Sequence, residues 1–218
     1  SQAKIKAAKG KPIAALFEMP KGDSIKTELL FIERCLSLLK PGGRMGIVLP
    51  EGVYNNPSLA YVRQFAEDRA KISAIISMPQ DTFVSAKAFV KTSLLFMQKF
   101  TEEESKKWLG LLSKKQNEIL AKQKKERGAL EAILKDRQAG KEKKKEVKTK
   151  LKELDDFMQS ESRRLARADF DYPIFMCEVE RVGISSTGEE DKNELPKILE
   201  EYEKFKEDSK NYGRNTHK

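Results

Sequence analysis

Histidine and cysteine are scarce in this chain of 218 residues. It contains one histidine, His217, and two cysteines, Cys35 and Cys177. A zinc site or a histidine-based catalytic centre needs several such side chains at set spacings, so we expect no metal site here. Two cysteines without a paired spacing also give no disulfide framework, which favours a reducing, cytoplasmic setting.

Long apolar runs are missing as well. No stretch is long enough to span a membrane, and we expect no membrane among the partners. Hydrophobic residues make up 39% of the chain and charged residues 35%. With so much charge, we expect one part of the chain to remain outside a packed core.

The positive charge is concentrated in one segment. Residues 114–152 contain 15 Lys and Arg against 6 Asp and Glu, a surplus that equals the net charge of +9 of the whole chain. The remainder is therefore neutral. A neutral part with a basic helical part suits a nucleic-acid or acidic partner, and a merely solvated helical surface is an equal alternative.

The stretch LSLLKPGGRMGIVLP, residues 36–50, organises the first half of the chain. Apolar residues at spacings of three and four predict an amphipathic helix over residues 28–39. Pro41, Gly42 and Gly43 end it, because proline cannot continue the helical hydrogen bonds and glycine tolerates the turn. The uninterrupted apolar run of residues 45–49 then predicts a strand that is buried on both faces.

Further strands and a helix follow. Asn56 and Pro57 are suited to the N-cap and first position of a helix over residues 58–69. Runs of apolar and β-branched residues predict strands over 72–78 and 92–100. This order is typical of an α/β fold with a parallel sheet and one terminal reversed strand.

From Glu102 the composition changes to good helix formers. We expect helices over residues 102–138 and 141–168, joined as a hairpin at Ala139 and Gly140. A coiled-coil-like spacing of four and three recurs in the second helix, at Val147, Leu151, Leu154, Met158 and Leu165.

The last fifty residues have a mixed pattern. We expect a short extended piece over 174–179, an acidic turn over 187–193, a helix over 195–206 and a disordered tail after Asp208. Residues 1–27 are expected to form an irregular loop.

Three segments in order and spacing carry a family resemblance: TELLFIERCLSLLKPGGRMGIVLPEGV, ISAIISMPQDTF and VKTSLLFMQKF. They resemble N6-adenine DNA methylases, a branch of the class I S-adenosylmethionine-dependent methyltransferases, and most closely the modification subunit of type I restriction-modification systems. The resemblance covers residues 25–100 and, more loosely, 169–205. It implies an α/β fold: the C-terminal half of a Rossmann-like sheet over residues 1–100, a basic helical extension over 101–168 and a C-terminal segment over 169–218.

The resemblance implies an enzyme that transfers a methyl group from S-adenosylmethionine to adenine N6 in DNA. The family holds this cofactor at a Gly-rich turn and the target amine with an Asn- or Asp-Pro-Pro-aromatic tetrapeptide. This chain contains neither a G-x-G nor a Pro-Pro sequence. We therefore expect catalytic and cofactor-binding residues to lie upstream of Ser1, and this chain alone to be inactive.

Some residues that face the substrate are expected in this chain. By resemblance, the loop before the last strand forms one wall of the target-base pocket, with Phe83, Phe89 and Lys91 as candidates; core packing is the alternative for each phenylalanine. Strand ends are where open α/β sheets bind ligands, which makes candidates of Glu51, Tyr54 and Asn55. A solvated loop is as consistent as DNA phosphate binding for Lys4, Lys6, Lys9 and Lys11.

The helical extension has three possible roles. By resemblance it docks against a specificity subunit, in a complex that also contains a restriction subunit. It could instead follow the DNA backbone, or act as a spacer without a partner. The rival to the whole interpretation is a non-enzymatic nucleic-acid or partner-binding module that retains a methyltransferase-like half sheet.

Overall fold

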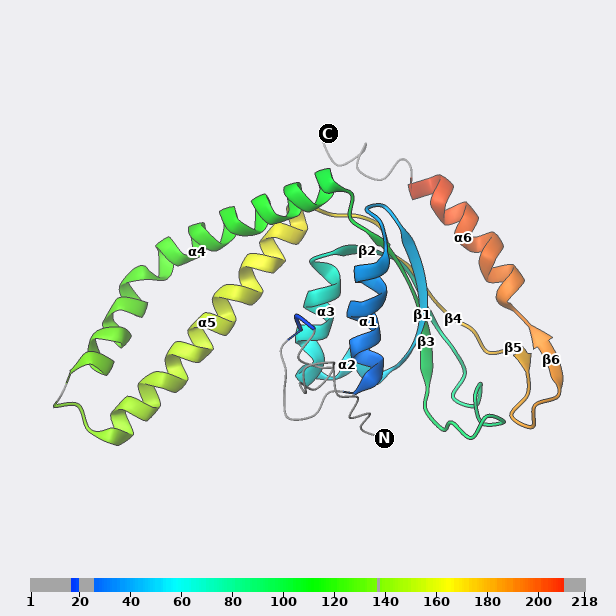
Figure 1. The fold of residues 1–218 in the computed structure, drawn as a ribbon, viewed down its shortest axis with the longest axis horizontal. Helices are drawn as coiled ribbons and strands as arrows, with labels where there is room; N and C mark the ends of the chain where they lie inside the picture. Colours follow the sequence, from blue (N-terminus) through cyan, green and yellow to red (C-terminus); the bar gives the residue numbers. More distant parts are fainter. Residues whose placement is uncertain (1–16, 20–25, 137, 210–218) are drawn as a thin grey trace, which may run out of the picture. The chain divides into compact units, whose positions relative to one another are not determined.

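The structure is a computed structural model that describes residues 17–19, 26–136 and 138–209. The chain forms two compact units: Ser1–Glu102 with Tyr172–Lys218, and Glu103–Asp171. The first unit contains the sheet and the second contains two long helices (Figure 1). The three-part division expected from the sequence stays a prediction. The expectations for residues 1–16, 20–25 and the tail from 210 lie outside the described residues.

Four strands form the main sheet of the first unit, in the order β1-β3-β2-β4. They are β1 (Arg44–Pro50), β2 (Ala70–Ser77), β3 (Thr92–Lys99) and β4 (Phe175–Glu178). β3 is antiparallel to both neighbours, and β4 is parallel to β2. The α/β class and the reversed strand are confirmed. The reversed strand lies inside the sheet, however, where the sequence pattern alone could not place it.

Short helices connect β1 to β2. α1 (Thr27–Leu38) precedes β1, and α2 (Gly52–Asn55), η2 (Pro57–Leu59) and α3 (Ala60–Glu67) follow it. The predicted cap is confirmed: the Asn56 side chain accepts a hydrogen bond from the Ser58 backbone N–H at 2.9 Å. The helix predicted over 58–69 begins as a 3-10 turn after Pro57, and the four-residue α2 was not predicted.

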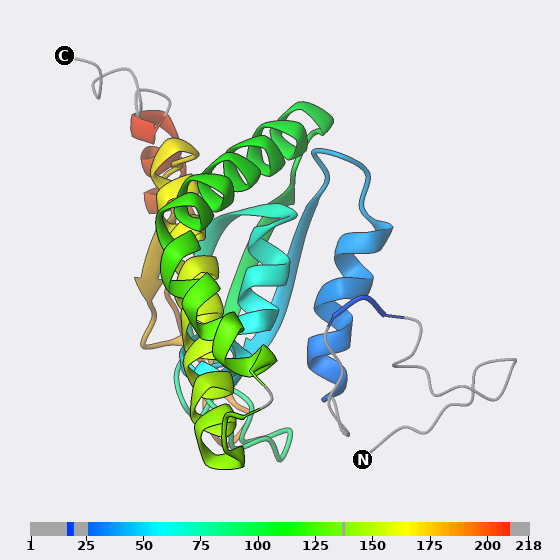
Figure 2. The ribbon, with the colours of Figure 1, turned by 90° about the vertical axis from the view of Figure 1, so that its left-hand side faces the viewer.

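α1 and α3 lie on one face of the sheet (Figures 1 and 2), and their side chains form the main hydrophobic core with those of the strands. α1 and α3 contribute buried side chains such as Leu29, Ile32 and Phe65. They pack in one cluster with Leu49 of β1 and Met97 of β3. Burying large aliphatic and aromatic side chains contributes about 1.5–3 kcal/mol each, so this layer holds the half sheet together.

The other face of β1 is not buried, contrary to the prediction. Exposure alternates along β1, with Gly46 exposed and Val48 45% exposed. Phe96 of β3, on the same face, is 38% exposed, and a Cβ on Gly46 would meet its ring at 2.9 Å. α6 (Leu195–Ser209) covers the part of this face that contains β4. β1 therefore has an apolar sequence with only one covered face in the described part of the chain.

A small second sheet corrects the turn predicted over 187–193: residues 187 and 188 do turn, but residues 190–193 form a strand. β5 (Val182–Ile184) pairs with β6 (Glu190–Asn193), and all four residues of β6 are exposed and polar. Backbone hydrogen bonds hold the two strands together. Gly183 and Gly188 have positive φ, a conformation that glycine adopts without strain. No apolar alternation marks such a strand in the sequence.

The second unit is the predicted helical hairpin, made of α4 (Glu102–Lys135) and α5 (Lys141–Asp169). The helices run antiparallel, because Trp108 meets Phe170 at 5.8 Å between ring centroids while Arg127 lies 3.6 Å from Asp155. Val147 is buried, and the other predicted seam residues are partly buried: Leu151, Leu154, Met158 and Leu165.

Trp108 provides a test of the hairpin's packing. Its side chain is fully buried against Phe170, and the Arg167 guanidinium lies 5.0 Å from its ring centroid. We expect Trp108→Ala to lower the free energy of unfolding by about 3–5 kcal/mol, measured by urea unfolding with circular dichroism at 222 nm. Leu109→Ala is the matched control: this neighbouring side chain is 58% exposed, so we expect a change within about 0.5 kcal/mol. Equal effects of the two substitutions would contradict the packing described here.

Candidate functional site

A carboxylate joins three strands at one edge of the sheet. Glu51 follows β1, and its Oε1 accepts hydrogen bonds from the hydroxyl of Ser77 at the end of β2 (3.3 Å) and from that of Ser93 in β3. The Glu51 backbone N–H also donates to the carbonyl of Lys91 at 3.0 Å. The edge is the one where β1 and β2 end, the position where open α/β sheets bind ligands.

Two buried hydroxyls lie among these elements. Tyr54 belongs to α2, and Thr92 opposes Pro50 at the start of β3. The hydroxyl oxygens of Tyr54 and Thr92 are buried, and no hydrogen-bond partner is found for either in the described part of the chain. Burial, helped by the negative charge of Glu51, raises the pKa of the Tyr54 hydroxyl above its usual range.

Lys91 and Glu178 extend the same edge. Glu178 ends β4, and its carboxylate lies 2.7 Å from the Lys91 ammonium. This hydrogen bond raises the pKa of Lys91. The pair is largely exposed, so it costs little to separate and either charge remains accessible to an incoming ligand.

The two phenylalanines of the loop differ in their surroundings. Phe83 is partly buried against a small cluster made of Ile76, Met78 and Val179. Phe89 is 70% exposed, and its carbonyl accepts a hydrogen bond from the Gln80 side chain at 3.3 Å. Of the two rings, that of Phe89 is the more exposed and offers more surface to a ligand.

The remaining candidates contribute less. Asn55 is exposed, and its backbone N–H donates to the Glu51 carbonyl at 3.4 Å. Lys4, Lys6, Lys9 and Lys11 lie outside the described residues. The structure therefore brings together Glu51, Tyr54 and Lys91 with Ser77, Ser93 and Glu178, and we call this group, where β1 and β2 end, the polar edge. Sequence reasoning missed Ser77, Ser93 and Glu178, whose only signal is that each lies at or next to a strand end.

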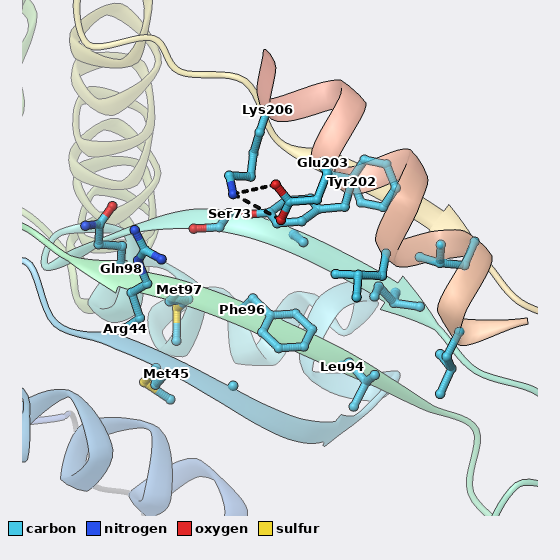
Figure 3. A pocket seen from close by; sticks show the side chains of 17 residues that line it. Arg44, Met45, Ser73, Leu94, Phe96, Met97, Gln98, Tyr202, Glu203 and Lys206 are labelled. Atoms are coloured by element: carbon cyan, nitrogen blue, oxygen red, sulfur yellow. Dashed lines mark hydrogen bonds and ion pairs between the residues drawn. The ribbon is translucent and has the colours of Figure 1, made fainter. Parts of the chain in front are cut away.

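A hollow of about 760 Å³ lies on the other face of the sheet, between β3 and α6 (Figure 3). Its lining is mostly apolar, with Phe96 and Leu94 on the sheet and Leu199 and Tyr202 on α6. An ion pair between Lys206 and Glu203 at 2.9 Å closes part of its rim. No sequence signal predicted this hollow.

The turn that follows β1 lacks the glycine pattern of a site for S-adenosylmethionine. Such a site needs a Gly-rich strand-to-helix turn and an acidic side chain that is free to bind the ribose hydroxyls. The turn from β1 to α2 contains one glycine, Gly52, and the carboxylate of Glu51 is engaged by Ser77 and Ser93.

In the described residues we find no ligand cluster for a metal and no helix that could cross a membrane.

The Tyr54 hydroxyl gives a test that depends on pH. We expect Tyr54→Phe to leave the free energy of unfolding unchanged or slightly higher at neutral pH, because the buried hydroxyl has no partner there. Above about pH 10, the ordinary tyrosine pKa, the unfolded chain loses this proton first. The native chain then binds more protons than the unfolded chain, so its stability falls as pH rises.

Tyr54→Phe should remove the part of this alkaline loss of stability that comes from the Tyr54 hydroxyl. The free energy of unfolding of both proteins is measured by urea unfolding at neutral and alkaline pH. A parallel decline of both proteins would show that Tyr54 ionises normally. Tyr61→Phe, also in the first unit, is the control for loss of a tyrosine hydroxyl.

Comparison with known proteins identifies the family. The model of the N-6 DNA methylase family matches residues 15–168. A Listeria monocytogenes protein assigned as a class I S-adenosylmethionine-dependent methyltransferase is 27% identical, with 41% of this chain and 27% of that chain covered and a TM-score of 0.36. No curated protein sequence matches.

A chain of a type I restriction-modification system, from work on its assembly and conformational transition, is 34% identical over 35% of this chain and 16% of that one, with a TM-score of 0.32. This chain thus spans about a quarter or less of each of these two proteins. TM-scores of 0.36 and 0.32 are too low to establish a shared fold. The assignment therefore depends on the family model, which covers well over half of the chain. The resemblance read from the sequence is confirmed: the chain belongs to the N-6 DNA methylase family.

Proposed function

We propose that this chain forms part of a site-specific DNA methyltransferase that methylates adenine N6, as the modification subunit of a type I restriction-modification system. The observation that carries the proposal is the family match over residues 15–168. S-adenosylmethionine is the cofactor that this family identity implies, and it would supply the methyl group. DNA, a specificity subunit and a restriction subunit are the proposed partners, and the cytoplasm is the proposed location.

The polar edge supports a role next to the substrate. An enzyme that modifies a base within a duplex must extrude it and hold it against apolar or aromatic surface. Phe89, with its exposed ring, is the proposed stacking residue, while the burial of Phe83 favours packing. Lys91, whose ammonium lies 2.7 Å from the Glu178 carboxylate, is available to meet a phosphate or a base edge.

Glu51 is proposed to position this wall. Its carboxylate accepts from Ser77 and Ser93, and its backbone bonds to Lys91. It thereby holds the ends of β1 and β2 against the start of β3, the strand that follows the loop with Phe89. Tyr54 packs with the core beneath, and Asn55 remains a proposed contact with substrate. Phosphate contacts by Lys4, Lys6, Lys9 and Lys11 also remain a proposal.

The helical hairpin is proposed as an assembly arm. Leu109 and Leu120 are 58% and 43% exposed, and their spacing of eleven residues places them on one side of α4. Exposed leucines in line on a long helix favour contact with another protein chain. The rival, a binding module without catalysis, would use the same arm and would not need the polar edge.

Methyl transfer tests the proposed function. The chain is produced as the corresponding part of a methylase of the same system, with no second, intact copy of this region present. Transfer of labelled methyl from S-adenosylmethionine to DNA is then measured, and the modified base is identified. We expect N6-methyladenine. A loss of one stacking contact costs about 1–3 kcal/mol, so Phe89→Ala should reduce kcat/KM for DNA about tenfold.

Phe31→Ala is the matched control, because Phe31 is 59% exposed and lies on α1, which contributes no residue to the hydrogen bonds that we describe around Glu51. It should leave methylation unchanged. Methylation of another base, or of no base, would overturn the proposed activity. Equal effects of the two substitutions would refute the role of Phe89 alone.

A further inference from the structure

The two halves of the helical hairpin differ in charge. The half around its tip, residues 120–154, contains 13 Lys and Arg against 6 Asp and Glu. The half nearer the ends of the hairpin, residues 103–119 and 155–171, contains 7 against 8. The buried aromatic contact of Trp108 with Phe170 lies in this nearly neutral half. Packing and positive charge are thus separated along the same two helices.

One side of α5 within the tip half carries lysine alone. Spacings of four, three and four residues place four exposed side chains in line: Lys141, Lys145, Lys148 and Lys152. We call these residues the lysine stripe. In the part of the chain that the structure describes, no ion pair is found for any of their ammonium groups. The stripe ends where Asp155 follows and pairs with Arg127 at 3.6 Å.

Another side of the same helix shows a different pattern. Lys143, Glu146, Lys150 and Glu153 alternate in sign, and the Lys150 ammonium lies 2.7 Å from the Glu146 carboxylate. Alternating pairs of this kind are sufficient to keep a helix soluble and to stabilise it. Solvation of α5 therefore explains this side and leaves the unmixed lysine stripe without a structural reason.

The dimensions of the stripe match a nucleic-acid backbone. Eleven residues of helix separate Lys141 from Lys152, a rise of about 16 Å. A DNA duplex carries about one negative charge per 1.7 Å of its axis, so a line of this length faces many phosphates. Residues 120–154 contain no Phe, Tyr or Trp, which excludes base stacking there and favours a duplex over a single strand.

We propose that the lysine stripe of α5 binds the phosphates of double-stranded DNA. The proposal rests on the proposed function for its choice of DNA as the polyanion. The contacts would be independent of base sequence and would hold the duplex against α5. The four lysine ammonium groups would contact the phosphates. Packing of α5 against α4 keeps the four lysines in line.

Two matched double variants test the stripe. Lys145→Gln with Lys148→Gln removes two charges from it, and Lys143→Gln with Lys150→Gln removes two charges from the other side of the same helix. Glutamine keeps the helix propensity close to that of lysine, and circular dichroism checks that both variants stay helical. Binding of the 218-residue chain to a short fluorescent duplex of arbitrary sequence is followed by anisotropy over a range of salt concentrations.

We expect the stripe variant to bind about tenfold more weakly. The plot of log affinity against log salt should become less steep, with the magnitude of its negative slope smaller by about two. The control variant should change affinity less than twofold. Equal weakening by the two variants would overturn the proposal, because net charge alone would then explain binding. So would a failure of the unmodified chain to bind duplex DNA, or its equally tight binding to polyglutamate, which would indicate an acidic protein partner. The assay contains no S-adenosylmethionine, so its outcome is independent of methyl transfer.

Discussion

The fold of the first unit depends on the insertion of β3 between β1 and β2. β3 pairs with β1 from Arg44 opposite Gln98 to Pro50 opposite Thr92, and with β2 up to Ser77 opposite Ser93. Because β3 runs opposite to its neighbours, its first residues lie beside the last residues of both. This places the Ser93 hydroxyl where Glu51 and Ser77 meet. A slip of one residue would turn Ser93 to the other face and dismantle the polar edge.

β1 has one exposed apolar face and one unpaired edge in the described part of the chain. Gly46 and Val48 of β1 and Phe96 of β3 form an apolar surface on this face, although the sequence of β1 suits burial on both faces. β1 is also an edge strand, with β3 as its one partner in the described residues. Unpaired edges and bare apolar faces are normally covered in native proteins. Both features agree with the proposal that this chain forms part of a larger methylase.

Local chemistry predicted much of this structure. The Pro41-Gly42-Gly43 turn, the Asn56 cap and the break between α4 and α5 could all be read from residues whose backbone preferences are strong. The order of the strands could not, because it depends on pairing between distant segments. Nor could β6, where four polar residues form a strand through backbone hydrogen bonds.

The site was predictable only in part, for the same reason. Glu51 was a candidate because it follows a strand, but its partners Ser77 and Ser93 come from strands whose neighbours the sequence did not reveal. The rings of Phe83 and Phe89 looked alike in sequence, and tertiary packing separates them. The charge of the hairpin was evident from composition, whereas the unmixed lysine stripe required the helical register of α5.

The central proposal is that this chain holds the substrate-side part of a methylase sheet and that S-adenosylmethionine binds to another part of the methylase. Calorimetric titration with S-adenosylmethionine tests it most directly. We predict no heat of binding for the 218-residue chain alone, and saturable binding when the chain is produced as part of a methylase of the same system. Clear binding by this chain alone would contradict the account, because a cofactor site would then have to lie among residues that we assign to structure or to substrate contact.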